Sequence, residues 1–371
     1  MEKASLQDLA TWHELNRCSN LEDRRLIFAD LEPLLKDLGP LFTVSSLGHS
    51  YESRPINKVV FGSGSTKVLI WTQMHGNEST GTKAVLDLFK WVEHPDRRIG
   101  LRDELLGRCT FCIVPMLNPD GAERYSRLDS QGIDLNRDVL EKKAPESRLL
   151  QELLKKFDPD YCFNMHDQRT IFSVGSPPQT ATLSFLAPSE NEERTLTSGR
   201  IRTMEVIAAI YESLKEVLPG KIGRYTDEFY PAATGDNFQR MGYSTVLIES
   251  GHFPGDYKRQ QTRKFTFLAL ISGLLQVARG NKKNFKNYFE IPDNEKFYLD
   301  RIVKNVRIAE ERGDMGVYFK ERLVEDQVKF LPILERFEDL SSFGADEVTS
   351  GEDLVFFSKE DAEKWLSIEF I

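Results

Sequence analysis

The chain has 371 residues, of which 58 are acidic and 49 basic, so its formal net charge at pH 7 is -9. Hydrophobic residues make up 40% of the chain and charged residues 29%, which is enough to bury a sizeable core and excludes a disordered chain. The acidic balance argues against a nucleic-acid partner, which calls for a basic surface to neutralise phosphates. It also argues against a polybasic membrane patch.

Targeting and membrane segments are not apparent in the sequence. The amino terminus reads MEKASLQDLATWHELNR, with polar residues where a signal peptide needs an apolar stretch. The longest apolar segment, residues 265–278, is too short to span a bilayer. We therefore expect a cytoplasmic protein without a membrane partner.

Short strand-like runs alternate with helical ones over the first two-thirds of the chain. Strands are predicted at residues 41–46, 56–62, 67–73, 110–116, 160–165 and 244–249. Helices are predicted at residues 80–92, 145–157, 196–218 and 263–278. The central strands are apolar on both faces, as strands covered by helices on either side are. Residues 1–280 are therefore predicted to form one α/β domain.

The pattern changes in the last quarter of the chain. A polar segment at 280–296 is followed by short alternating runs, with little helical periodicity after about residue 312. We expect residues 290–371 to form a small, mostly β C-terminal domain, to which the sequence assigns no role.

The motif His75-Gly76-Asn77-Glu78 directly follows the strand predicted at 67–73. In a sheet covered by helices, ligands bind at the carboxyl ends of the strands. Histidine and glutamate are ligands of catalytic zinc, which takes three protein ligands and keeps one position for water. Taken alone the pattern is weak, because a loop or capping histidine explains His75 equally well.

A third metal ligand must come from elsewhere in the chain. His166 leaves the strand predicted at 160–165 and therefore reaches the same edge of the sheet. His252 follows a later strand and is a less favoured spare ligand or substrate contact. The remaining histidines lack acidic partners and are expected to be solvated at the surface: His13, His49 and His94.

A polar loop at 117–138 joins two of the predicted segments and begins with the turn Asn118-Pro119-Asp120-Gly121. Arginines and an asparagine near a metal suggest recognition of a planar anion such as a carboxylate. The loop carries Arg124, Arg127, Asn136 and Arg137, of which Arg124 is better explained as a solvated residue. Later in the chain Glu249 ends an apolar strand, where a surface acid is the plain alternative to a catalytic one.

Five motifs occur in order between residues 75 and 249, and they read HGNE, NPDG, RLDSQGIDLNR, NMHD and LIESG. Together they resemble the zinc carboxypeptidase family typified by pancreatic carboxypeptidase A. The resemblance implies a mixed, mostly parallel eight-stranded sheet flanked by helices over roughly residues 20–280. It does not cover the C-terminal tail.

The resemblance also implies the catalytic residues. One zinc ion per chain would be held by His75, Glu78 and His166, with Glu249 as the general base. Arg127 matches the arginine that polarises the scissile carbonyl.

The residues that would bind the substrate follow from the same resemblance. Asn136 and Arg137 match the pair that grips the terminal carboxylate of the substrate. Tyr230 is the best match for the mobile tyrosine of the family, and Tyr225 is its competitor. The family commonly has asparagine where this chain has Asp138, which places an acid beside Arg137.

The leading interpretation is a zinc hydrolase that removes residues from the carboxyl end of peptides, with a murein-peptide amidase as a variant of the same chemistry. A zinc deacylase of the aspartoacylase or succinylglutamate desuccinylase type is the alternative, because HGNE before a helix resembles its metal turn. The NPDG and DLNR motifs speak against it. A non-catalytic binding module is a third class.

The expected substrate is a peptide or a small carboxylated amide. Asp236 would favour a substrate with a basic terminal residue, unless this aspartate is structural.

Overall fold

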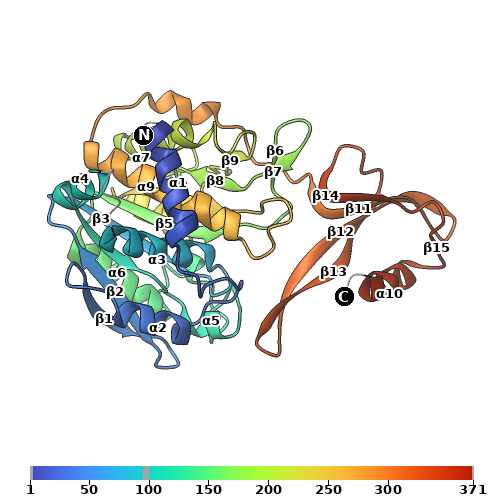
Figure 1. The fold of residues 1–371 in the computed structure, drawn as a ribbon, viewed down its shortest axis with the longest axis horizontal. Helices are drawn as coiled ribbons and strands as arrows, with labels where there is room; N and C mark the ends of the chain where they lie inside the picture. The colour runs from blue at the N-terminus through green and yellow to red at the C-terminus, as the bar shows by residue number, and fades with distance from the viewer. Residues whose placement is uncertain (1–2, 95–99, 370–371) are drawn as a thin grey trace.

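The computed structural model describes residues 3–94 and 100–369. Figure 1 shows a larger part that contains the amino terminus and a smaller part at the carboxyl end, which consists mainly of strands. The larger part is built on eight strands: β1 (Thr43–His49), β2 (Pro55–Phe61), β3 (Thr66–Thr72), β4 (Cys109–Val114), β5 (Tyr161–Asp167), β8 (Leu183–Leu186), β9 (Ile222–Arg224) and β10 (Ser244–Ser250). A separate small hairpin is formed by β6 (Ser173–Val174) and β7 (Gln179–Thr180).

The order of strands in the large sheet is β1-β2-β4-β3-β5-β10-β8-β9. The four central strands β4, β3, β5 and β10 are parallel to one another, and β9 is parallel to β8. The remaining pairs are antiparallel. The predicted mixed, mostly parallel eight-stranded sheet is therefore confirmed.

Helices flank this sheet (Figure 1). They are α1 (Lys3–Asn16), α2 (Phe28–Lys36), α3 (Thr80–Glu93), α4 (Leu101–Arg108), α5 (Pro119–Glu123), α6 (Pro145–Phe157), α7 (Ser198–Leu214), α8 (Thr234–Arg240) and α9 (Gln260–Arg279), with short 3-10 helices η1 (Leu135–Arg137) and η2 (Phe285–Glu290). The four predicted helices correspond to α3, α6, α7 and α9. The prediction missed the helices α1, α2, α4, α5 and α8 and the short strands β6, β7, β8 and β9.

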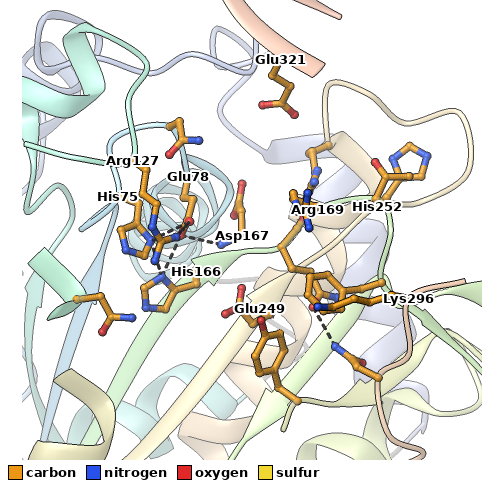
Figure 2. Close-up of a pocket in the computed structure, with 18 of the residues that line it drawn as sticks. His75, Glu78, Arg127, His166, Asp167, Arg169, Glu249, His252, Lys296 and Glu321 are labelled. Atoms are coloured by element: carbon orange, nitrogen blue, oxygen red, sulfur yellow. Dashed lines mark hydrogen bonds and ion pairs between the residues drawn. The ribbon is translucent and has the colours of Figure 1, made fainter. Parts of the chain in front are cut away.

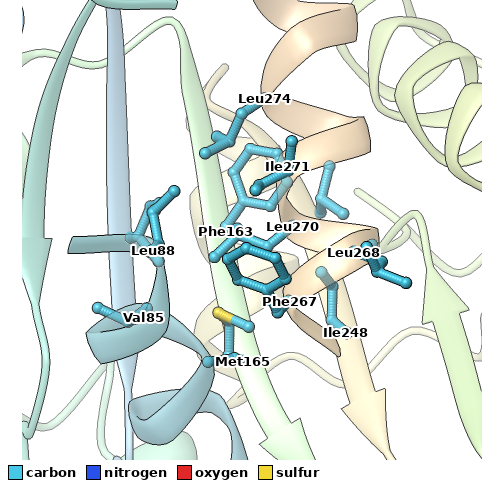
Figure 3. Close-up of a cluster of buried hydrophobic side chains, with 14 of the residues drawn as sticks. Val85, Leu88, Phe163, Met165, Ile248, Phe267, Leu268, Leu270, Ile271 and Leu274 are labelled. Carbon is cyan, nitrogen blue, oxygen red and sulfur yellow. The ribbon is translucent and has the colours of Figure 1, made fainter. Parts of the chain in front are cut away.

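The strands bury apolar side chains on both faces because successive side chains point to opposite sides of a sheet. On β3, Val68 and Ile70 belong to the core region shared with α3, α7 and α9. Leu69 and Trp71 belong to the region on the other face, shared with α6 and α8. Figure 3 shows the first region, where α9 packs against Phe163 of β5.

The expectation that His13 is a solvated histidine is wrong. His13 is fully buried on α1, and its Nε2 lies 2.9 Å from Oδ2 of Asp87 on α3. Arg263 of α9 donates to both oxygens of the same carboxylate, at 2.6 and 2.7 Å. These partners lie 74 and 176 residues apart along the chain, so no local pattern could reveal them.

The C-terminal part is a five-stranded sheet with one helix packed on it. Its elements are β11 (Tyr298–Ile308), β12 (Glu311–Val324), β13 (Gln327–Glu338), β14 (Gly344–Ser350), β15 (Val355–Phe356) and α10 (Lys359–Glu369). The predicted β character is confirmed, but α10 was not predicted; its Ala362 and Trp365 pack against sheet residues that include Val303 and Met315. The domain limits 1–280 and 290–371 stay a prediction.

The hairpin of β12 and β13, called the wall hairpin below, contacts the larger part through charged side chains. Nε of the buried Arg24 lies 3.3 Å from Glu321 on β12. Nε2 of His252 lies 2.7 Å from Asp346 on β14. The two parts are therefore joined by an ion pair and by a histidine–carboxylate contact, both largely shielded from solvent. Among the described residues, no helix combines the length and the apolar character needed to cross a membrane.

Candidate active site

The loop that follows β3 is shaped by close backbone packing. Gln73 adopts a positive φ of 49°, and its side chain donates to the carbonyl oxygen of Gly76 at 2.8 Å. A Cβ on Gly76 would lie 1.9 Å from the backbone of Gly121, so only glycine fits there. Asn118 accepts a hydrogen bond from the Gly121 N–H and donates to the Met74 carbonyl. The NPDG turn therefore braces the loop that carries His75 and Glu78.

Three potential metal ligands converge at the carboxyl ends of β3 and β5 (Figure 2). The Nδ1 atoms of His75 and His166 lie 3.1 Å apart. Glu78 reaches both rings, with one oxygen 2.8 Å from His75 Nδ1 and the other 2.9 Å from His166 Nδ1. All three side chains are buried, and the backbone N–H of Asp167 donates to Glu78 at 3.1 Å.

This donor set fits a zinc ion. Two imidazole nitrogens that face each other cannot both carry a proton, and their lone pairs converge with a carboxylate on one point. Bonds of about 2.0–2.1 Å in tetrahedral geometry separate ligand atoms by about 3.3 Å, close to the separations found here. Two histidines and one glutamate are also a known ligand set of catalytic zinc. His75, Glu78 and His166 are therefore the residues that would hold the metal.

Asp134 was not predicted as a site residue, and it orients two residues that were. Its Oδ1 lies 3.1 Å from Nε2 of His75, and its Oδ2 accepts a hydrogen bond from Nε of Arg127 at 3.0 Å. Although burial acts the other way, these two partners hold the pKa of Asp134 well below its usual range. A carboxylate behind a ligating histidine fixes the ring orientation and the tautomer. The only sequence signal was its place in the DLNR motif.

Replacing Asp134 by asparagine is expected to weaken zinc binding about 10- to 100-fold, because the charge that orients His75 is lost. Competition with a chromophoric chelator measures the affinity. Asp138→Asn is the matched control: Asp138 is buried in the same loop, but among the described residues its carboxylate accepts hydrogen bonds only from the backbone N–H groups of Lys143 and Ala144, both at 2.9 Å. Equal affinities of wild type and Asp134→Asn would contradict this role.

Glu249 ends β10 directly beside β5. It is the register partner of His166 in the parallel pair, which places the two side chains at the same edge of the sheet. Burial, together with the Glu78 and Asp167 carboxylates, raises the pKa of Glu249 well above its usual range. A partly exposed carboxylate that lines a cavity beside a metal cluster is suited to proton transfer.

The predicted substrate-binding residues line the same cavity, whose volume is about 990 Å³. Asn136 accepts a hydrogen bond from the Thr234 N–H at 3.1 Å, which leaves its amide hydrogens as the donors it can offer. The guanidinium of Arg137 lies 5.6 Å from the ring centre of Tyr230. Tyr225 lines the cavity as well, and burial and the charge of Glu249 raise its pKa to about 12.

Two acidic residues near Arg137 have different surroundings. The Asp138 carboxylate accepts hydrogen bonds from the backbone N–H groups that precede α6. It is therefore bound to the backbone and not to the guanidinium of Arg137. Asp236 lines the cavity and is buried, and it accepts a hydrogen bond from the Tyr230 N–H at 3.1 Å. Burial raises the pKa of Asp236 to about 6, so its carboxylate is still mainly ionised at pH 7.

Arg24 and the wall hairpin were not anticipated at this site. Arg24 is 4% exposed and donates to Asp167, the neighbour of His166, at 3.0 Å. It also pairs with Glu321, which accepts the Tyr125 hydroxyl as well. The hairpin adds Tyr318, Phe319, Lys320, Glu321, Phe330, Ile333 and Glu335 to the cavity lining. The C-terminal part therefore forms one side of the cleft.

His252 lines the cavity but is not one of the converging ligands found among the described residues. Its Nε2 binds Asp346 of β14, which also accepts the Tyr298 hydroxyl at 3.1 Å. The suggestion of a spare metal ligand is therefore replaced by a contact between the two parts of the chain. The partner lies 94 residues further on, beyond the reach of local sequence patterns.

Comparisons with known proteins agree with this geometry. Residues 29–170 match the family model described as zinc carboxypeptidase. Carboxypeptidase 2 of Trichophyton rubrum is 30% identical over 112 residues, and probable carboxypeptidase 2 of Arthroderma benhamiae is 28% identical over 120 residues. These alignments cover 28% and 30% of this chain, and only 19% and 21% of the fungal proteins.

Solved structures share the fold. A metallo-carboxypeptidase from Burkholderia cenocepacia aligns with a TM-score of 0.55 at 18% identity and covers 70% of both chains. Carboxypeptidase A from Helicoverpa armigera has a TM-score of 0.53 at 15% identity, with 76% of this chain and 82% of that chain covered. At these identities the likeness concerns the fold alone.

The family match is the comparison that includes the site, since it spans His75, Glu78, Arg127 and His166. Residues 29–170, which contain these four residues, therefore match the zinc carboxypeptidase family.

Proposed function

We propose that the protein is a zinc-dependent carboxypeptidase that releases the terminal residue of peptides. The observation that carries the proposal is the convergence of His75, Glu78 and His166 beside Glu249. The predicted anion-binding residues line the same cavity. The family match supports the assignment.

The residues of this chain would divide the work of peptide hydrolysis. Zinc, when bound, would lower the pKa of a coordinated water toward ~7 and polarise the scissile carbonyl. Glu249 takes the proton of the attacking water and passes it to the leaving amine. Arg127 donates to the oxygen that becomes negative, and losing such a donor typically costs ~3 kcal/mol of transition-state stabilisation. Asp134 keeps Arg127 in place for this task.

The position of cleavage would be set by the terminal carboxylate. Asn136 and Arg137 supply an amide and a guanidinium, which bind a carboxylate in a defined orientation. The scissile bond is then held one residue from the end of the peptide. Asp236 has no cationic side chain within ion-pair distance among the described residues, so we propose that it selects a basic terminal residue. Tyr230 and Tyr225 both remain candidates for the tyrosine that covers the substrate.

The deacylase alternative is not favoured. The NPDG and DLNR segments are both engaged in this site, since Asn118 braces the metal loop and Asp134 orients His75. The family match also covers both segments.

Incubation with a pool of peptides that differ in their last residue tests the proposal. We expect single residues to be released from the carboxyl end, with Lys and Arg preferred because Asp236 is ionised at pH 7. Chelation is expected to abolish release, and added zinc to restore it. N-acyl amino acids serve as the comparison substrates; their hydrolysis without any peptide cleavage would favour the deacylase.

A further inference from the structure

Four cationic side chains line the cavity where the C-terminal part adjoins the cleft: Arg169, Arg259, Lys296 and Lys320. Within the described part of the chain, none of them has a carboxylate at ion-pair distance. Figure 2 shows Arg169 and Lys296 across the pocket from His75 and His166. These four residues are called the basic cluster below.

Arg259 is the buried member of the basic cluster. It is 5% exposed, and its guanidinium donates to the carbonyl oxygens of Ser250 and Gln168, the latter at 2.7 Å. Carbonyl oxygens hold the guanidinium in place without neutralising its charge. Arginine is almost never buried without being paired, and Glu249 and Glu321 interact with Arg259 without forming an ion pair, so an anionic ligand is its natural direct partner.

The other three members, Arg169, Lys296 and Lys320, are exposed and line the cavity, and the first two lie against aromatic rings. The Arg169 guanidinium lies 6.0 Å from the ring centre of Tyr318, and Lys296 Nζ lies 5.8 Å from that of Phe172. Such contacts orient the side chains and leave N–H donors free for a ligand. Lys320 comes from β12 of the wall hairpin.

The acids of the cavity act on the basic cluster only from beyond ion-pair distance; the charge of Arg259, for example, acts to lower the pKa of Glu249 and of Glu321. Glu321 is already paired with Arg24 and accepts the Tyr125 hydroxyl. Glu228 accepts the Tyr230 hydroxyl, and therefore belongs with the residues around α8. On the wall hairpin, Glu335 is the remaining acid that lines the cavity. Acids and basic residues are equally numerous in the lining of the whole cavity, but within the described part of the chain no acid forms an ion pair with a member of the basic cluster.

The direction in which a peptide would bind brings the residues before the scissile bond to the basic cluster. If Asn136 and Arg137 bind the terminal carboxylate, the rest of the peptide must leave the metal centre on the other side. Arg169 and Lys296 lie across the pocket from His75 and His166, and the basic cluster and the wall hairpin line the same cavity. A cavity of about 990 Å³ is at the upper end of the range that encloses drug-sized ligands, so it has room for more than the terminal residue.

We propose that the basic cluster is a second anion-binding subsite, which selects peptides with an acidic side chain shortly before the terminal residue. This inference rests on the proposed carboxypeptidase function. The C-terminal part would then supply substrate specificity, through Lys320 and through Tyr318 beneath Arg169.

Three peptides test the subsite; they are identical except that the two residues before the terminal residue are Glu, Gln or Lys. We expect kcat/KM to be about tenfold higher for Glu than for Gln, mainly through KM, since a charged hydrogen bond contributes about this much. The double variant Arg169→Gln/Lys296→Gln is expected to bring the ratio near one. Lys329→Gln, on the same hairpin but outside the cavity lining, is the matched control and keeps the preference.

Binding of the same peptides to the zinc-loaded Glu249→Gln variant, measured by calorimetry, gives a readout without turnover. Tighter binding of the Glu peptide supports the subsite even if no peptide is cleaved, in which case only the proposed function fails. Equal cleavage and equal binding of all three peptides overturn the subsite and leave the carboxypeptidase assignment intact.

Discussion

The Glu249→Gln variant is expected to lose about 10²- to 10⁴-fold in kcat for peptide hydrolysis, because the amide cannot accept the proton of the attacking water. The substitution keeps the size of the side chain, and Glu249 is not one of the three converging ligands found among the described residues. Zinc content should therefore equal that of the wild type. Steady-state kinetics and metal analysis on the same preparation measure both quantities.

Glu152→Gln is the control for this prediction, since Glu152 is an exposed acid of α6. It should behave as the wild type in both measurements. Glu249 would be excluded as the general base by a kcat in Glu249→Gln within threefold of the wild-type value. A loss of activity together with a loss of zinc would instead assign Glu249 a role in the metal site.

The second large effect is expected from His166→Ala, which removes one of the three converging ligand atoms. Mutating a residue that hydrogen-bonds to a metal ligand typically lowers the metal affinity about 10- to 100-fold. Removing a ligand itself should therefore lower the affinity for zinc by more than this. We expect the purified variant to contain less than one zinc ion per chain and to show no measurable peptide hydrolysis. Elemental analysis after dialysis against metal-free buffer checks the first expectation.

His252→Ala is the matched histidine control. His252 lines the same cavity, but its Nε2 is bound to Asp346. This variant should keep one zinc ion per chain, while its thermal unfolding temperature falls because a buried contact between the two parts is lost. Full zinc occupancy in His166→Ala would remove His166 from the metal site.

Much of the fold could be predicted because its signals are local. Buried parallel strands such as β3 and β5 need apolar residues on both faces, and this pattern is visible within seven residues. The strands that were missed are short, since β8 has four residues and β9 three, too few for a period to show. The helix α10 was missed because it follows a segment with a consistently β-type pattern.

The candidate ligands were predictable for a related reason. His75 and Glu78 lie three residues apart on one turn, and His166 ends a strand that the apolar pattern identifies. The ends of parallel strands meet at one edge of the sheet, so their side chains converge without further information. The resemblance to a known family then implied a role for each of these residues, and these roles stay predictions.

By itself, then, the sequence determined the α/β fold, the three residues that converge on one point and the neighbouring glutamate. Only the tertiary structure decided that Asp134 orients His75, that Arg24 joins Asp167 to Glu321, and that the C-terminal part lines the cleft. The physical reason is separation along the chain: Arg24 and Glu321 are 297 residues apart. Such contacts arise from the packing of whole elements, which no periodicity or motif within one segment encodes.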